Sequence, residues 1–185
     1  IDDLYVSTDD SEIANVSGNS RVSGIIRRPP ELATDSATSQ DGVVHAIEYL
    51  SNLGKQYKYV CLLQASSPLR QSFHIDEASE LIVVRKAQAI IGVCETQCSL
   101  NWMGYLPPDH SMERILAQKN QTKDAPCSYQ INGAIYFFTV ADPISQTRIF
   151  PVSGSYAYVM DRKYSIDIDT MEELTVAKAI MESIR

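Results

Sequence analysis

Two aspartates near the end of the sequence have the residue type and spacing of a metal site. Asp167 and Asp169 alternate with Ile166 and Ile168 in the segment SIDIDT. If the segment is a strand, both carboxylates share one face, with Cα atoms about 6–7 Å apart, and the isoleucines point into a core. Such a pair suits Mg²⁺, which takes carboxylate oxygens, water and substrate phosphates. On spacing alone, the commoner explanation of this alternation is a strand end with a solvated acidic face.

The cysteines and histidines do not form a recognisable metal or nucleophile pattern. Cys94 and Cys98 are four residues apart without further ligands at a zinc-type spacing, and the sequence contains no CxxC pair. We therefore expect the cysteines to be buried, reduced thiols in a cytoplasmic protein. The histidines have no evident serine or cysteine partner, so a hydrolase triad is not expected.

Alternating strand and helix patterns must position these groups. Strands are predicted at 3–10, 57–64, 87–94, 131–138, 156–160 and 165–169, and helices at 10–18, 41–54, 72–86 and from 171 onwards. Gly18 and Gly54 are expected to end the first two helices. Ser72 is expected to cap the third, and Thr170 with Glu173 to form the capping box of the last.

Composition restricts the class of protein. The 185 residues are 44% hydrophobic and 21% charged, which suits one soluble globular domain. The net charge of −7 without a basic block argues against nucleic acid as the main partner. The sequence has no apolar run of about 18 residues, so no membrane span is expected. Strand–helix alternation predicts an α/β fold, a mostly parallel or mixed sheet with helices on both faces.

Six segments occur in the order of one known family. They are VSTDDSEIA, RRPPELATDSATSQDGVVHAIE, LLQASSPLR, NWMGYLPPDHSM, INGAIYFF and YSIDIDTMEEL. Together they resemble the acylneuraminate cytidylyltransferases, also called CMP-sialic acid synthetases, over essentially the whole chain. The resemblance implies a Rossmann-like nucleotidyltransferase that joins CTP to a nonulosonic acid, a nine-carbon sugar acid, and releases pyrophosphate.

The resemblance also implies roles for individual residues. Asp167 and Asp169 match the catalytic pair that holds Mg²⁺ at the α-phosphate and the attacking hydroxyl. Arg28, Ala37 and Ser39 match positions that border the nucleotide. The residues expected to border the sugar acid are Gln64, Ser66, Asn132, Tyr136 and Phe150, the last from a partner subunit.

The expected organisation follows from the same resemblance. Residues 1–185 are predicted to be a single cytidylyltransferase domain that is incomplete at its N-terminus. The irregular segment at about 95–130, together with 139–155, is expected to form a small excursion that makes a homodimer. The expected partners are thus CTP, the sugar acid and a second copy of the chain, without nucleic acid or membrane.

The sequence departs from the family pattern in two places. No counterpart of the Gly-rich loop ARGGSKGIPGKN is present, and this loop would supply N–H donors to the triphosphate. A non-catalytic homologue therefore stays open as an alternative. Thr122 and Gln130 stand where an arginine is common, with Lys119 and Lys123 nearby. The group that pairs with the sugar carboxylate, and the choice among sialic, legionaminic and pseudaminic acid, stay open too; Kdo fits poorly.

Overall fold

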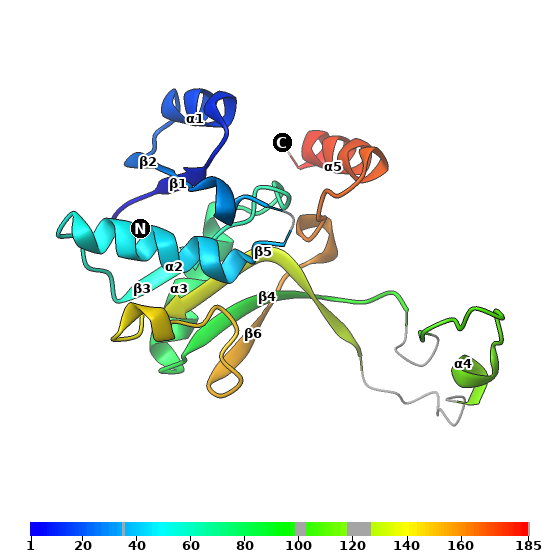
Figure 1. Cartoon of the computed structure of the whole chain (residues 1–185). Coiled ribbons are helices and arrows are strands. Elements are labelled where there is room, and N and C mark those ends of the chain that lie inside the picture. Colours follow the sequence, from blue (N-terminus) through cyan, green and yellow to red (C-terminus); the bar gives the residue numbers. More distant parts are fainter. Residues whose placement is uncertain (35, 99–102, 118–126, 185) are drawn as a thin grey trace. The chain divides into compact units, whose positions relative to one another are not determined.

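The computed structural model of the chain describes residues 1–34, 36–98, 103–117 and 127–184. The chain divides into two compact units. The first comprises Ile1–Leu62 and Phe138–Pro151, and the second comprises Leu63–Phe137 and Val152–Arg185. Strands and helices alternate along the chain (Figure 1), which confirms the predicted α/β class.

Two sheets contain the strands. The strands are β1 (Tyr5–Thr8), β2 (Gly24–Arg27), β3 (Tyr59–Leu62), β4 (Ala89–Glu95), β5 (Tyr129–Thr139) and β6 (Ser155–Val159). β1 and β2 form a parallel pair, and the larger sheet has the order β3–β5–β4–β6. Within it, β4 and β6 run parallel. The expectation of mostly parallel or mixed sheets is therefore confirmed.

Five helices and three short 3₁₀ turns are found among the described residues. The helices are α1 (Ser11–Gly18), α2 (Ser39–Asn52), α3 (Ser72–Val84), α4 (Glu113–Ala117) and α5 (Met171–Ser183). The turns are η1 (Pro30–Leu32), η3 (Ile144–Gln146) and η4 (Arg162–Tyr164). None of the described helices is both long enough and apolar enough to span a lipid bilayer.

The observed N-cap agrees with the prediction for α5 and differs from it for α2 and α3. Thr170 and Glu173 form the predicted capping box of α5. α2 begins before residue 41, because Thr38 is its N-cap and forms a capping box with Asp41. α3 is capped by Gln71, so the prediction that Ser72 is its cap was wrong. The N–H of Gln71 donates to Nδ1 of His74 in the first turn at 2.9 Å. Gln71 is thus the N-cap, and Ser72 is the first residue of the helix.

The segment 165–169, which lies within the described residues, does not form the predicted strand. An irregular loop joins η4 to α5 instead. Its backbone N–H groups donate to groups other than a neighbouring strand. The N–H of Ile168 donates to the carbonyl of Ser66 at 2.8 Å, and that of Asp169 donates to the Glu173 carboxylate at 2.8 Å. Because these partners replace a strand ladder, the apolar–acidic alternation does not form a pleated face.

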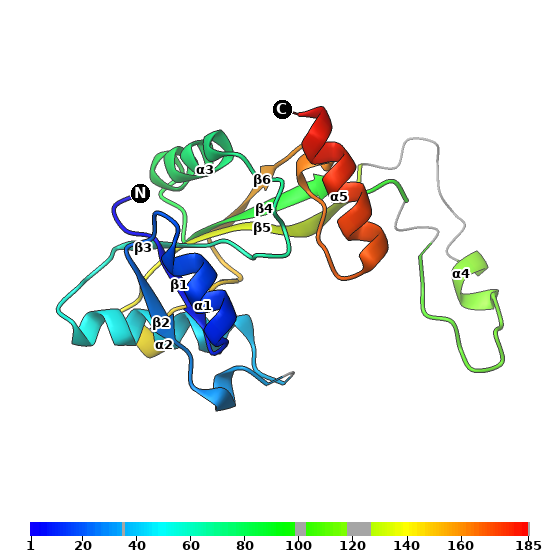
Figure 2. The same ribbon diagram turned by 90° about the horizontal axis from the view of Figure 1, so that it is seen from above.

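The core of the second unit lies between α3 and the sheet, which Figure 2 shows side by side. Ala78 and Ile82 of α3 are fully buried, as are Ile90 of β4 and Ile135 of β5. These buried side chains anchor β4 and β5, and the carboxyl end of β4 and the beginning of β5 extend from this anchored part of the sheet. Polar residues at those two ends are therefore presented by a rigid scaffold.

The cysteines form no disulfide, and all four lie among the described residues. Cys94 is buried and Cys61 is half-buried, whereas Cys98 and Cys127 are exposed. The prediction of buried thiols was therefore wrong for the last two, which lie in polar segments beyond β4 and before β5. A hydrogen bond with the nearby Glu95 carboxylate raises the pKa of the Cys127 thiol.

Candidate functional site

The loop after β3 brings the first candidate side chains into place. Arg70 fixes this loop, since its Nε donates to the Ala134 carbonyl at 2.8 Å and its guanidinium also donates to the Gln64 carbonyl. The N–H of Ser67 donates to the same Gln64 carbonyl at 3.3 Å. Arg70 thus holds the loop against β5, and the Gln64 side chain extends from a constrained backbone.

Gly133 of β5 is the point on which the candidate side chains converge. It has φ +73°, which an L side chain adopts only with strain. A Cβ at this position would lie 2.8 Å from Gln64 Oε1, 2.8 Å from Ser67 Oγ and 3.3 Å from Asp167 Oδ2. Three polar side chains from distant parts of the sequence therefore meet over a backbone position that only glycine fits.

Ser67 connects the β3 loop to the acidic loop. Its hydroxyl is fully buried and lies 3.2 Å from the Asn132 carbonyl and 3.4 Å from Asp167 Oδ1. Tyr136 is also buried nearby, and its pKa is raised by burial first and by the Asp167 charge second. The half-buried Asp167 carboxylate thus lies beside an aromatic residue and a hydroxyl whose one proton it shares with the Asn132 carbonyl.

Asn132 is a buried scaffold residue, with 2% of its surface exposed. Its Nδ2 donates to Ser165 Oγ at 2.9 Å, and its Oδ1 accepts from the Ala134 N–H at 3.1 Å. A Cβ on Gly92 of β4 would lie 2.7 Å from Oδ1, so glycine there makes room for the amide. Both polar atoms of Asn132 are engaged within the protein and tie β5 to the loop that carries Asp167.

The second aspartate lies in a different environment. Asp169 is exposed, and its N–H and that of Thr170 both donate to Glu173 Oε2 at 2.8 Å. Hydrogen bonds from the Asp169 N–H first, and then from the Thr170 hydroxyl and N–H, lower the pKa of Glu173. Within the described ranges, no three His, Cys, Asp or Glu side chains gather into a metal site. An ion held by one or two of these carboxylates would have to take its other ligands from water and substrate, as Mg²⁺ commonly does.

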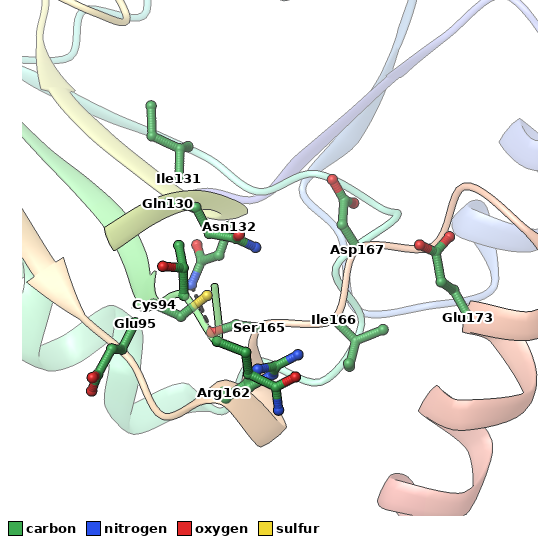
Figure 3. A pocket seen from close by; sticks show the side chains of 12 residues that line it. Cys94, Glu95, Gln130, Ile131, Asn132, Arg162, Ser165, Ile166, Asp167 and Glu173 are labelled. Carbon is green, nitrogen blue, oxygen red and sulfur yellow. Dashed lines mark hydrogen bonds between the residues drawn. The ribbon is translucent and has the colours of Figure 1, made fainter. Parts of the chain in front are cut away.

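A cavity of about 310 Å³ lies beside these groups in the second unit (Figure 3). This volume is within the range of small-molecule sites. Its walls come from the end of β4, the beginning of β5, η4, the loop before α5 and the first turn of α5, and include Glu95, Gln130, Asn132, Arg162, Asp167 and Glu173. In Figure 3, the carboxylates of Asp167 and Glu173 lie at one end, while that of Glu95 lies at the other and points away.

Comparison with known proteins finds relatives along most of the chain. It is 32% identical over 173 residues to N-acylneuraminate cytidylyltransferase of Streptococcus agalactiae serotype V, covering 92% of this chain and 40% of the relative. It is 28% identical over 181 residues to pseudaminic acid cytidylyltransferase of Campylobacter jejuni, covering 97% and 78%. The resemblance to the acylneuraminate cytidylyltransferases is confirmed. No family model matches the chain.

The two kinds of cytidylyltransferase relative differ in length. The N-acylneuraminate cytidylyltransferase of Escherichia coli O18:K1:H7 is 30% identical over 179 residues, which are 96% of this chain but 42% of the relative. The chain thus spans about 40% of the N-acylneuraminate enzymes. It spans 78% of the pseudaminic acid enzyme.

The residues that the cytidylyltransferase resemblance assigns to the nucleotide belong to the first unit. Arg28 is half-buried, and its guanidinium donates to the Ser7 carbonyl at 2.7 Å and to Ser7 Oγ at 3.3 Å. Ala37 precedes α2, and its N–H donates to the Thr34 carbonyl at 3.0 Å. Ser39 is the exposed first residue of α2. Arg28 is therefore anchored to β1, while the other two lie at the beginning of α2.

Phe150, expected to reach a partner subunit, also belongs to the first unit. Its side chain is 51% exposed. The segment before it is held to the first turn of α2 by Gln40, whose Nε2 donates to the Thr147 carbonyl at 2.7 Å and whose Oε1 accepts from the Ile149 N–H at 3.0 Å. The aromatic ring thus projects from a well-anchored segment.

Sequence reasoning missed two residues of the second unit that the structure brings to the site. Ser67 lies beside Asp167, whereas the predicted Ser66 is half-buried and its carbonyl accepts a hydrogen bond from the Ile168 N–H. Two adjacent serines in ASSPLR carry no signal for which one faces inward. Arg162 lines the cavity, and its only sequence signal was proximity to SIDID. The predicted alternatives Lys119, Thr122 and Lys123 lie outside the described residues.

Proposed function

We propose that the protein is a cytidylyltransferase that joins CTP to a nonulosonic acid, giving the CMP-sugar and pyrophosphate. The names of its relatives support this reaction class. The observation that carries the proposal is the convergence of Gln64, Ser67 and Asp167 over Gly133, beside a cavity of about 310 Å³. Polar, acidic and hydroxyl groups around a ligand-sized cavity suit a hydroxylated, phosphorylated substrate pair.

In the proposed reaction, the anomeric hydroxyl oxygen of the sugar acid attacks the α-phosphorus of CTP. The bond from that phosphorus to the oxygen bridging to the β-phosphate breaks, pyrophosphate leaves, and the hydroxyl proton passes to solvent. Asp167 and Asp169 are the residues that would hold Mg²⁺. When bound, the ion would neutralise phosphate charge and lower the pKa of the hydroxyl.

The remaining side chains orient and enclose the substrates in this proposal. The Ser67 hydroxyl shares its one proton between the Asn132 carbonyl at 3.2 Å and Asp167 Oδ1 at 3.4 Å, and its buried position beside Asp167 limits how the carboxylate turns. Gln64 presents its amide to the sugar acid, and Tyr136 forms an apolar wall beside it. Arg28, Ala37 and Ser39 border the cytidine, as the family resemblance implies. Asn132 acts through the loop that it holds, because its own polar atoms are engaged.

The assembly and location are further parts of the proposal. We propose a cytoplasmic homodimer in which the segments 95–130 and 139–155 contribute the contact and Phe150 reaches the partner's sugar site. The exposed ring of Phe150 and the exposed apolar residues of the described excursion support this arrangement, among them Met103, Tyr105 and Leu106. Sedimentation of the purified protein should give twice the monomer mass; a monomer at micromolar concentration would contradict the arrangement.

A second candidate substrate has a specific observation in its favour. Of the relatives described above, the two N-acylneuraminate enzymes are at least 30% identical but are covered to about 40%, whereas the pseudaminic acid enzyme is covered to 78%. Both acids share a carboxylate and an anomeric hydroxyl, so the reaction chemistry is the same. The choice between them depends on how the cavity contacts the rest of the sugar.

The test is pyrophosphate release by the protein with its natural N-terminus. Mg²⁺ and CTP are supplied with N-acetylneuraminic, legionaminic, pseudaminic or Kdo acid in separate reactions. We expect release with one nonulosonic acid and none without an acid. A folded protein that binds CTP but releases no pyrophosphate with any acid would refute the catalytic proposal in favour of a binding role.

A further inference from the structure

The cavity of the second unit is lined by more acids than bases. Among its lining residues, all within the described part of the chain, Arg162 is the one lysine or arginine. The lining carboxylates are Glu95, Asp167 and Glu173. An anionic ligand that enters such a cavity is repelled by these acids unless its charge meets a cation. The arginine is therefore the lining side chain that can favour an acid over a neutral sugar.

The guanidinium of Arg162 is available for a ligand. No hydrogen bond or ion pair engages it among the described residues. Arg70 differs, because its guanidinium donates to two backbone carbonyls and so has a structural role. A guanidinium presents several N–H donors in a planar fork that matches the two oxygens of a carboxylate. The N–H donors of the Arg162 guanidinium, unlike those of Arg70, can therefore bind a ligand.

A buried network fixes the backbone from which Arg162 extends. The Arg162 carbonyl accepts from the Ser165 N–H at 3.0 Å, closing the η4 turn. Ser165 Oγ in turn accepts from Nδ2 of the buried Asn132 at 2.9 Å and lies 3.1 Å from the Asp161 carbonyl. Figure 3 shows Arg162 and Ser165 together on one wall of the cavity. The Arg162 side chain is exposed and its backbone is fixed by the η4 turn, an arrangement that suits binding.

We propose that Arg162 binds the carboxylate of the sugar acid and so determines that the substrate is an acid. This inference rests on the proposed function. Gln130 lines the same cavity with an uncharged amide, so it cannot supply the charge that a carboxylate needs. Arg162 is thus a specificity-determining residue, separate from the carboxylates proposed to hold the metal ion.

The first experiment compares steady-state kinetics of three variants with the acid that the wild type turns over. Arg162→Gln should raise the KM for the acid by about 10- to 100-fold, the usual effect of losing a charge-assisted hydrogen bond, and leave the KM for CTP within about 2-fold. Arg162→Lys should fall between, since it keeps charge but loses the fork. Lys163→Gln is the matched control, because Lys163 is the exposed neighbour that lies over the Tyr164 ring and does not line the cavity.

The second experiment changes the substrate instead of the protein. The methyl ester of the same acid lacks the negative charge, so the wild type should lose about as much affinity for the ester as Arg162→Gln loses for the acid. Arg162→Gln should then show little further loss with the ester, because the interaction is already gone. If the affinity losses caused by the ester and by Arg162→Gln instead multiply when the two changes are combined, the inference is overturned. Circular dichroism and thermal unfolding confirm that each variant is folded.

The two proposals fail in different ways. An active wild type with an unchanged KM in Arg162→Gln would overturn this inference and leave the cytidylyltransferase proposal intact. A wild type that releases no pyrophosphate with any acid would overturn the proposed function, and this inference with it.

Discussion

Substituting Gly133 by alanine tests the geometry of the candidate site directly. The residue has φ +73°, where a side chain costs about 1–2 kcal/mol. The added Cβ would also lie 2.8 Å from Gln64 Oε1 and 2.8 Å from Ser67 Oγ. The Ser67 hydroxyl is fully buried and cannot move away freely, so overpacking should add about 1–3 kcal/mol. The expected total loss of unfolding free energy is about 2–5 kcal/mol.

Two glycine controls separate backbone strain from crowding. Gly54 has φ +78°, and no atom lies within 4 Å of the position that a Cβ would take, so Gly54→Ala should cost only the strain, about 1–2 kcal/mol. Gly154 has φ +76° and lies in the same unit as Gly133; a Cβ there would lie 2.8 Å from Gln88 Cγ and 3.3 Å from Gln88 Cβ, atoms next to the backbone that cannot turn away freely. Gly154→Ala should therefore lose about as much stability as Gly133→Ala, and it serves as the control for crowding away from the candidate site.

Urea denaturation followed by circular dichroism gives these free energies, and the melting temperature should fall by about 2–4 °C per kcal/mol for a chain of this size. Turnover should fall by about 100-fold in Gly133→Ala, because Asp167 and Gln64 are displaced from their positions. Equal stability losses for Gly133→Ala and Gly54→Ala, with wild-type turnover in both, would refute the convergence of side chains on Gly133.

Three further predictions concern single side chains. Asp169→Ala should abolish turnover while leaving the melting temperature unchanged; a near-normal rate would remove the metal assignment. Ser67→Ala should lower turnover about 10-fold and raise the Mg²⁺ concentration needed for half-maximal rate, because Asp167 loses the hydroxyl that it shares with the Asn132 carbonyl; an unchanged Mg²⁺ requirement would contradict this role. Burial lowers the pKa of His74 below that of the unfolded chain, so stability should fall as the pH drops from about 7 to about 5. Denaturation across that range should show a flatter profile for His74→Gln than for the wild type, and an equally steep profile would contradict the role of His74.

The sequence predicted the regular elements that have strong local signals. Apolar runs identified β4 and β5, because both strands are buried in the larger sheet. Helical spacing identified α2, α3 and α5, and the capping box at Thr170 marked the beginning of the last. Each of these signals acts within a few residues, so no knowledge of the fold was needed to read them.

The sequence failed where hydrogen bonding with distant residues decides the conformation. β2 is four residues long and exists through its ladder with β1, which no local pattern announces. The segment 165–169 alternates like a strand, yet its N–H groups donate to Ser66 and Glu173. A period of two is a necessary feature of a half-buried strand, but it does not provide the neighbouring strand.

For the candidate site, the sequence by itself determined the family resemblance and the residue types: two aspartates, an amide and an aromatic in motifs of fixed order. Tertiary structure alone decided which groups meet. Ser67, Gly133 and Asp167 are far apart in the sequence, and β5 brings them within contact distance of one missing Cβ. The tertiary structure also decided that Arg70 hydrogen-bonds to backbone carbonyls, whereas Arg162 lines a cavity. The reason is physical, because a side chain's role depends on the partners that satisfy its donors and acceptors, and those partners are set by the fold.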